Sequence, residues 1–185
     1  MNMLANIAVG FLESSSIAKG IEAADAMCKM ASVKLAKTSI LARGKYMILI
    51  TGPVGEVESS LRAGKEVLDK ALVDEVLIRN VHRQVVNALD QRHAVDVVGA
   101  LGIVETKEAI SAVKAADAAA KAASVHVLEV KTVVGGGKGY FTVCGEVGDV
   151  RSAIAAAVSA LKPDQIVSHV VIAQSDPQLL AAVGI

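Results

Sequence analysis

Aromatic residues make up only 2% of this 185-residue chain, and tryptophan is absent. Proteins that bind single-stranded nucleic acid stack bases on aromatic side chains, and two Tyr and two Phe are too few for that role. Charge of one sign is also lacking, because 19 Lys and Arg balance 19 Asp and Glu. The chain therefore has no net field that gathers nucleic acid or an anionic membrane, and we expect neither as a partner.

Cysteines and long apolar runs are scarce as well. Cys28 and Cys144 have no CxxC partner and no metal-ligand spacing, and both lie in apolar runs, which predicts two small buried thiols in a reducing compartment. The four histidines are scattered and no nucleophile–base pair stands out, so we expect neither a metal site nor an enzyme. No segment approaches the roughly 18 apolar residues of a membrane span, and the apolar start has no basic n-region. These features predict a soluble cytoplasmic protein.

Glycine, in contrast, is concentrated in one loop. Gly135, Gly136 and Gly137 are consecutive, and Gly139 follows two places later, between two β-rich runs. Glycine allows sharp turns and close backbone approach, so this loop must come near a ligand or near copies of itself. A phosphate-binding loop would need Ser or Thr after its lysine, whereas Lys138 is followed by Gly139.

Self-comparison shows that the chain contains two copies of one unit. Residues 8–14 (AVGFLES) match 100–106 (ALGIVET), and residues 23–33 (AADAMCKMASV) match 115–125 (AADAAAKAASV), both at an offset of 92. After a shift of one residue, Gly44-Lys45 corresponds to Gly137-Lys138, and residues 52–57 correspond to 145–150. The chain is therefore a tandem duplication.

Each copy has the pattern βαββαβ followed by a short helix, which predicts an α+β fold with helices packed on a sheet. We place the first domain at residues 1–92, a polar linker at 93–97 and the second domain at 98–185. The closing helices are expected at 84–89 and 177–183. Ser14 and Thr106 are predicted N-caps of the first helices, and Glu13 and Glu105 are expected near helix N–H groups. In the first copy, the face of the first helix directed toward the sheet is predicted to consist of Ile17, Ile21, Ala24, Cys28 and Ala31.

These duplicated motifs, with Ala-Asp-Ala and then Lys in the first helix and Gly-x-Val-Gly-x-Val before the second, resemble the bacterial microcompartment shell domain. Two copies in one chain resemble the tandem-domain shell proteins, and residues 136–140 (GGKGY) bring the chain nearest to the propanediol-utilisation type. The resemblance implies a homotrimer that mimics a six-fold hexamer, a pore on its axis, and edge-to-edge tiling with other shell proteins. A trimeric ligand-binding regulatory module of the βαββαβ type is the alternative, and it would require a polar pocket.

The resemblance also implies site residues. The family's pore loop falls on Leu41, Ala42, Arg43 and Gly44 in the first copy and on Gly135, Gly136, Gly137 and Gly139 in the second. The edge lysine falls on Lys29 and Lys121, for which a solvated helix-end role is the alternative. In the family's Pro-Arg-Pro-His edge motif, Asn80 and Gln174 stand in place of the Arg, and His82 retains the His, which becomes Asp176 in the second copy.

Two further expectations follow from the resemblance. The related proteins hold an iron–sulfur cluster through a Cys between the Lys and the Tyr of the loop, but this chain has Gly139 there, so we expect no cofactor. Arg43 stands where the family has a small polar residue at the narrowest point, which predicts a cationic pore that favours small polar or anionic metabolites. The alternative is that Arg43 folds back onto a neighbouring carboxylate.

Overall fold

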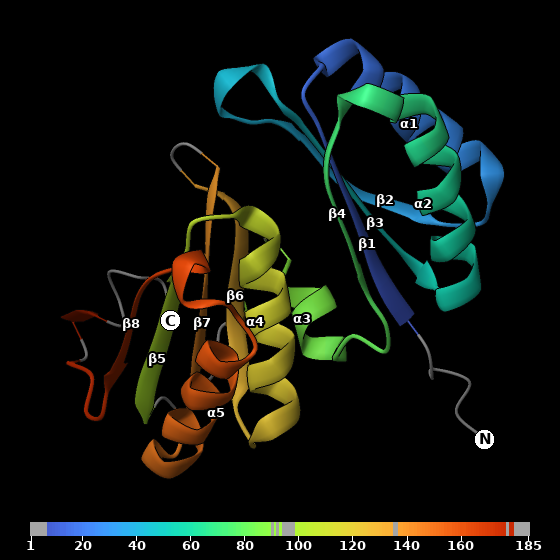
Figure 1. The fold of residues 1–185 in the computed structure, drawn as a ribbon. Helices are drawn as coiled ribbons and strands as arrows, with labels where there is room; N and C mark the ends of the chain where they lie inside the picture. Colours follow the sequence, from blue (N-terminus) through green and yellow to red (C-terminus); the bar gives the residue numbers. More distant parts are fainter. Residues whose placement is uncertain are drawn as a thin grey trace, which may run out of the picture. The chain divides into compact units, whose positions relative to one another are not determined.

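The computed structural model describes residues 7–89, 91, 93, 99–134, 137–176 and 178–179. The chain forms two compact units, Met1–Val81 and His82–Ile185 (Figure 1). The predicted domain end at residue 92 lies outside the described residues, as does all of the predicted linker except His93. Each unit is an α+β fold with one four-stranded antiparallel sheet, which confirms the predicted fold class.

The first unit has the predicted order of strands and helices. Its sheet has the order β2-β3-β1-β4, and each neighbouring pair is antiparallel. Helices α1 and α2 pack against each other and cover one face of this sheet (Figure 1). The elements are β1 (Ile7–Ser14), α1 (Ile17–Met30), β2 (Lys34–Ile40), η1 (Ala42–Gly44), β3 (Tyr46–Pro53), α2 (Val54–Leu68), η2 (Asp69–Ala71) and β4 (Leu72–Ile78).

The second unit repeats this arrangement, with the strand order β6-β7-β5-β8 and with α4 and α5 on the sheet. The edge strands match even in their irregularity, because the register shifts between Leu35 and Lys37 in β2 and between Val127 and Glu129 in β6. The elements are α3 (Arg83–Ala88), β5 (Ala100–Thr106), α4 (Ala109–Ala122), β6 (His126–Val134), β7 (Lys138–Gly145), α5 (Val147–Ser159), η3 (Pro163–Gln165) and β8 (Ile166–Ile172).

The helices approach the sheets closely, as expected from a core with few aromatic side chains. A Cβ added to Gly10 of β1 would lie 2.7 Å from Val57 of α2. At the same place in the second unit, a Cβ added to Gly102 of β5 would lie 2.8 Å from Ile154 of α5. Glycine at the centre of each first strand is thus required by the close approach of the second helix.

At one further contact between the first helix and the third strand, the glycine lies on the helix in the first unit and on the strand in the second. In the first unit, Tyr46 at the start of β3 packs on Gly20 of α1, where an added Cβ would lie 2.5 Å from the tyrosine ring. In the second unit, the helix carries Ala112 and the strand carries Gly139, whose added Cβ would lie 2.7 Å from Ala112. Each glycine makes room for a larger partner, so Gly139 is required for the packing of β7 on α4.

The predicted orientation of α1 is wrong. Ile21 and Cys28 were expected to face the sheet, but Ile21 is 54% exposed and Cys28 is exposed. Three of the four buried positions carry only Gly or Ala, which permits a close approach of the helix, whereas hydrophobicity alone favours the isoleucines. The buried positions of this helix are Gly20, Ala23, Ala24 and Met27.

The duplicated Ser14 and Thr106 do not cap the helices that follow them, contrary to the prediction. The Ser14 hydroxyl donates to the Ser16 carbonyl and the Thr106 hydroxyl donates to the Glu108 carbonyl, each at 2.8 Å, so both brace the turn between strand and helix. In the first unit the N-cap is Ser16, whose Oγ accepts a hydrogen bond from the Lys19 N–H at 3.3 Å. Glu108 stands at the N-cap of α4 and makes no side-chain cap bond.

Helix α3 packs on α4 and β6 of the second unit, although the sequence pattern assigned it to the end of the first copy. The chain after α3 runs along the outer edge of β6. Leu89 forms a parallel bridge with Val130, and the His93 N–H donates to the Leu128 carbonyl at 2.8 Å. The edge strand β6 is therefore covered by residues that follow the first compact unit in sequence.

Candidate functional site

The loop between β2 and β3 is a tight turn that presents Arg43. Leu41 is buried, and its N–H donates to the Lys45 carbonyl at 2.8 Å, which closes the loop. Arg43 and Gly44 both have positive φ, at 61° and 73°. Ala42, Arg43 and Gly44 are exposed, and within the described part of the chain Arg43 makes no ion pair. A guanidinium at the tip of this turn is free to face a ligand or a neighbouring copy.

The corresponding loop between β6 and β7 is described only in part. Gly135 and Gly136, both predicted pore residues, lie outside the described residues. Gly137 has φ 97°, and a Cβ added there would meet nothing within 4 Å, so the backbone conformation of the turn, not lack of space, favours glycine at this position. Gly139, also a predicted pore residue, lies within β7, and the position that a side chain would occupy there faces α4.

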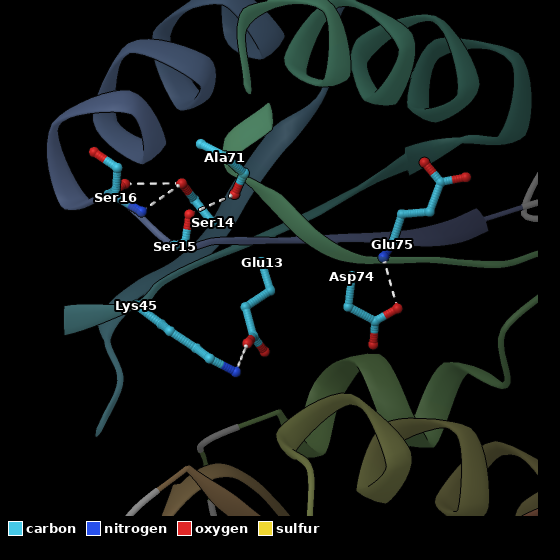
Figure 2. A network of polar contacts seen from close by, with 8 residues as sticks. All are labelled: Glu13, Ser14, Ser15, Ser16, Lys45, Ala71, Asp74 and Glu75. Carbon is cyan, nitrogen blue, oxygen red and sulfur yellow. Dashed lines mark hydrogen bonds and ion pairs between the residues drawn. The ribbon is translucent and has the colours of Figure 1, made fainter. Parts of the chain in front are cut away.

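A duplicated ion pair anchors both loops to the first strand of their sheet. Lys45 Nζ lies 2.6 Å from Glu13 Oε1, and Lys138 Nζ lies 2.9 Å from Glu105 Oε1. Figure 2 shows the Lys45 side chain extending to Glu13, beside the bonds of Ser14 and Ser16. The Glu13 side chain is only 6% exposed, so its charge needs this partner.

Sequence reasoning missed this pairing, since it expected the two glutamates near helix N–H groups. The signal was present in the alignment of the copies, because Glu13 and Lys45 both recur at matched positions. Matched opposite charges on neighbouring strands indicate a pair once the strand order is known.

The predicted edge residues occupy different surroundings in the two units. Lys29 Nζ lies 2.5 Å from Asp25 on the exposed surface of α1, where the two side chains are 74% and 61% exposed. Lys121 lies at the same distance from Asp117, but the Asp117 side chain is only 10% exposed. Asp117 also accepts a hydrogen bond from the His82 N–H at 2.7 Å, so the structure joins two predicted edge residues, His82 and Lys121.

The other two predicted edge residues lie at the surface. Asn80 follows β4 in a turn with φ 53°, and Gln174 follows β8; both are exposed. Their matched places after the last strand of each sheet agree with the duplication.

The two thiols lie in contrasting surroundings. Cys28 is exposed on α1, and Cys144 is buried in β7 beside Leu101 and Leu128. Burial raises the pKa of the Cys144 thiol above its ordinary value of 9.0, which disfavours the thiolate that metals require. Among the described residues, no three His, Cys, Asp or Glu side chains gather as metal ligands would. No described helix is long and apolar enough to span a bilayer.

A surface hollow of about 470 Å³ lies between α2 and β4, away from the glycine loops. Most of its charged lining is paired, since Lys65 lies 2.8 Å from Glu75 and Glu58 lies 2.7 Å from Arg79, and Arg62 contacts the Ser59 hydroxyl at 3.5 Å. Such a site offers a ligand few unpaired polar groups.

Comparison with known proteins identifies the family. The BMC domain matches residues 8–81 and again residues 100–175. The chain belongs to the BMC domain family. It carries two such domains in tandem and is a shell protein of bacterial microcompartments.

The relatives agree with this assignment. The bacterial microcompartment shell protein PduT of Citrobacter freundii is 40% identical over 151 residues, which cover 81% of this chain and 82% of PduT. The carboxysome shell protein CsoS1C of Halothiobacillus neapolitanus is 35% identical over 92 residues, which cover 48% of this chain and 94% of that protein. A shell domain of this kind therefore aligns with about half of the chain.

Two solved structures are similar to this chain. A crystal structure of a microcompartment protein from Desulfitobacterium hafniense DCB matches with a TM-score of 0.89 at 40% identity, covering 95% of this chain and 98% of that one. A fused, permuted hexameric shell protein from the RMM microcompartment shares the fold, with a TM-score of 0.64 at 23% identity over 86% of this chain and 85% of that one.

Proposed function

We propose that this tandem-domain shell protein forms a homotrimer that acts as a pseudohexameric tile with a central pore. The observation that carries this proposal is the alignment of the carboxysome shell protein CsoS1C, over 94% of its length, with only 48% of the chain. If each domain takes one position of a six-position ring, three chains close it. The expected mass is about 57 kDa, from a 19.0 kDa chain.

The pore is lined by the two hairpin loops, Leu41 to Gly44 in the first domain and Gly135 to Gly137 in the second. Support comes from Arg43, which is exposed at the tip of its turn and makes no ion pair with a described residue. Around a three-fold axis, three guanidiniums alternate with three glycine turns. A ring of permanent positive charge attracts anions and repels cations, so the passage favours small anionic or polar metabolites.

The tile joins other shell proteins through its rim, with Lys29, Lys121, Asn80, His82 and Gln174 as the edge residues. Lys29, Asn80 and Gln174 are exposed, which fits contact with a neighbouring tile. The Lys121 side chain is 43% exposed, and its ion pair with Asp117 holds the ammonium group in place for the contact with a neighbouring tile.

The role is structural and transport-related rather than catalytic, and the chain holds no resident iron–sulfur cluster. A cluster on the axis needs thiolates that converge there. Cys144 is buried within β7, Cys28 is exposed on α1, and Gly139 has no space for a side chain on the side facing α4. This set of donors does not fit a cluster.

Light scattering and negative-stain electron microscopy test the tile. We expect a trimer at micromolar concentration and sheets or tubes when the protein is concentrated. A stable monomer or dimer would overturn the proposal. Isolated trimers with saturable nucleotide binding and no sheets would favour a ligand-binding regulatory module instead.

A further inference from the structure

The two domains differ in what covers the edge of the sheet. In the second unit, α3 and the residues after it lie along β6. In the first unit, the outer edge of β2 receives no backbone hydrogen bond from another described segment. An open sheet edge with unpaired N–H and C=O groups is a docking site for another segment.

The covered edge shows how such docking works. The Gln84 side chain accepts a hydrogen bond from the Val127 N–H at 2.8 Å and donates to the Val125 carbonyl at 3.2 Å. Its amide thus replaces the peptide group of a neighbouring strand. Two residues before it, the His82 N–H donates to Asp117 of α4 at 2.7 Å. These bonds fix the start of α3 on both the helix and the strand.

The matching positions of the first unit are exposed. Leu35 is 41% exposed where its counterpart Val127 is 4%, and Ile21 is 54% exposed where Val113 is 0%. The Asp25 side chain is 61% exposed, against 10% for Asp117. The counterparts are secure, because the offset of 92 holds in both α1 and β2 and the edge strands share their irregularity. Among the described residues, the first domain therefore has the docking surface without the cover that the second domain has.

In the second copy, the segment that corresponds to α3 in sequence is the chain after β8. Ile78 and Ile172 end their strands at the same register, opposite Val9 and Leu101. Counting on from them, Gln178 takes the place of Gln84, and Leu179 takes the place of Val85. Val85 is 0% exposed on the second domain, whereas Leu179 is 37% exposed.

The side chains of this segment suit the same docking. The Asp176 carboxylate accepts a hydrogen bond from the Gln178 N–H at 2.8 Å, as an N-cap does, and the residue after Asp176 in the sequence is a proline, which is favoured after an N-cap. Residues 179–183 (LLAAV) are apolar like their counterparts 85–89 (VVNAL) at four of five positions.

We propose that residues 175–183 of one chain dock on the β2 edge and on α1 in the first domain of the next chain. The Gln178 amide bonds there to the Val33 carbonyl and the Leu35 N–H, and Asp25 accepts the Asp176 N–H. The contact is head-to-tail, so it repeats from chain to chain until a ring closes. That the ring contains three chains rests on the proposed function. A trimer then has three contacts of this kind within chains and three between chains, and together they join the six domains of the ring.

A pair of matched substitutions tests this docking. Gln178→Ala removes the amide between chains, and Gln84→Ala removes the same amide within the chain. Because Gln178→Ala deletes two hydrogen bonds at each of three contacts, we expect at least a roughly tenfold rise in the concentration at which trimers dissociate. Gln84→Ala should lower the melting temperature and leave that concentration unchanged. Equal effects of both variants on dissociation would overturn the proposal.

Cross-linking gives an independent test in a Cys28→Ser background, which removes the exposed native thiol. Leu89 and Val130 are bridge partners within the chain, and Val183 and Thr38 are their counterparts. Oxidised Thr38→Cys/Val183→Cys should give covalent dimers and trimers on a non-reducing denaturing gel. The control Leu89→Cys/Val130→Cys should stay at the mass of one chain.

The outcomes separate the two proposals. A wild-type trimer with a chain-sized band for Thr38→Cys/Val183→Cys would overturn the docking and leave the tile standing. Stable trimers of a chain that ends at Gln174 would also overturn the docking and leave the tile standing. A ladder of cross-linked chains without a closed trimer would support the docking and contradict the proposed ring.

Discussion

Asp117 and Asp25 occupy the same place in the two domains, and alanine at each should have very different effects. Asp117 accepts the His82 N–H and pairs with Lys121, with its side chain only 10% exposed. Losing a hydrogen bond to a charged acceptor costs about 1.5–3 kcal/mol, and the partly exposed ion pair adds about 0–1 kcal/mol. The better helix propensity of alanine offsets roughly 0.5 kcal/mol. The free energy of unfolding of Asp117→Ala should therefore fall by about 1–3 kcal/mol.

Asp25→Ala should change the free energy of unfolding of the separated chain by less than about 0.5 kcal/mol, since its ion pair with Lys29 is exposed. Its effect should appear instead as weaker assembly. Asp117→Asn is the matched control for charge, because an amide oxygen still accepts the His82 N–H, so most of the stability should return.

The assay is urea unfolding followed by circular dichroism at two protein concentrations, with light scattering to separate assembly from folding. For a domain of this size, the loss in Asp117→Ala corresponds to a fall in melting temperature of about 5–15 °C. Equal destabilisation by the two alanine variants would refute the reasoning, and so would a loss below about 0.5 kcal/mol for Asp117→Ala.

Further predictions concern the proposed tile and the two thiols. Lys29→Asp with Lys121→Asp should leave trimers intact but reduce sheet formation, because reversed charges disturb contacts between tiles; unchanged sheets in electron micrographs would remove the edge assignment. Arg43→Ser should shift pore selectivity from anions toward cations in bilayer conductance, and unchanged selectivity would place Arg43 outside the pore. Protein purified without reconstitution should show no iron–sulfur absorbance, and visible bands that disappear in Cys144→Ser would contradict this. With a thiol reagent, Cys28 should react at once and Cys144 only when the protein unfolds. Burial raises the pKa of Cys144 above 9.0, so only the unfolded thiol ionises as the pH rises past that value. The free energy of unfolding should therefore decrease above that pH.

The sequence alone was sufficient for the fold class and the order of elements. Duplication carried much of this inference, because each pattern occurs twice in the chain, and the closing helix expected at 84–89 is α3 (Arg83–Ala88). The alternation of apolar residues in strands and their recurrence every three or four residues in helices are local properties of the chain, so they can be recognised without knowledge of its contacts. The resemblance to the shell family rested on the same repeated motifs.

The orientation of α1 could not be read in this way. Hydrophobicity directs Ile21 toward the core, but the helix instead buries Gly20, Ala23, Ala24 and Met27. Its contact with the sheet depends on Gly20 packing against Tyr46 of β3, which lies far from the helix in sequence. The packing of Gly139 against Ala112 is of the same kind, because it depends on the residue that faces each position.

The pairing of Glu13 with Lys45 and the docking of α3 on β6 were also decided only by the tertiary structure. In each case the contacting residues are far apart in sequence, and no periodic pattern indicates that they meet. The order of the strands in the sheet brings them together, and this order is not evident from the sequence. The sequence by itself determined that the chain is two copies of one α+β unit, since local patterns and self-similarity are written in residue order. Only the tertiary structure decided which edge is covered and which is left open, because edges are closed by side chains and N–H groups that meet in space.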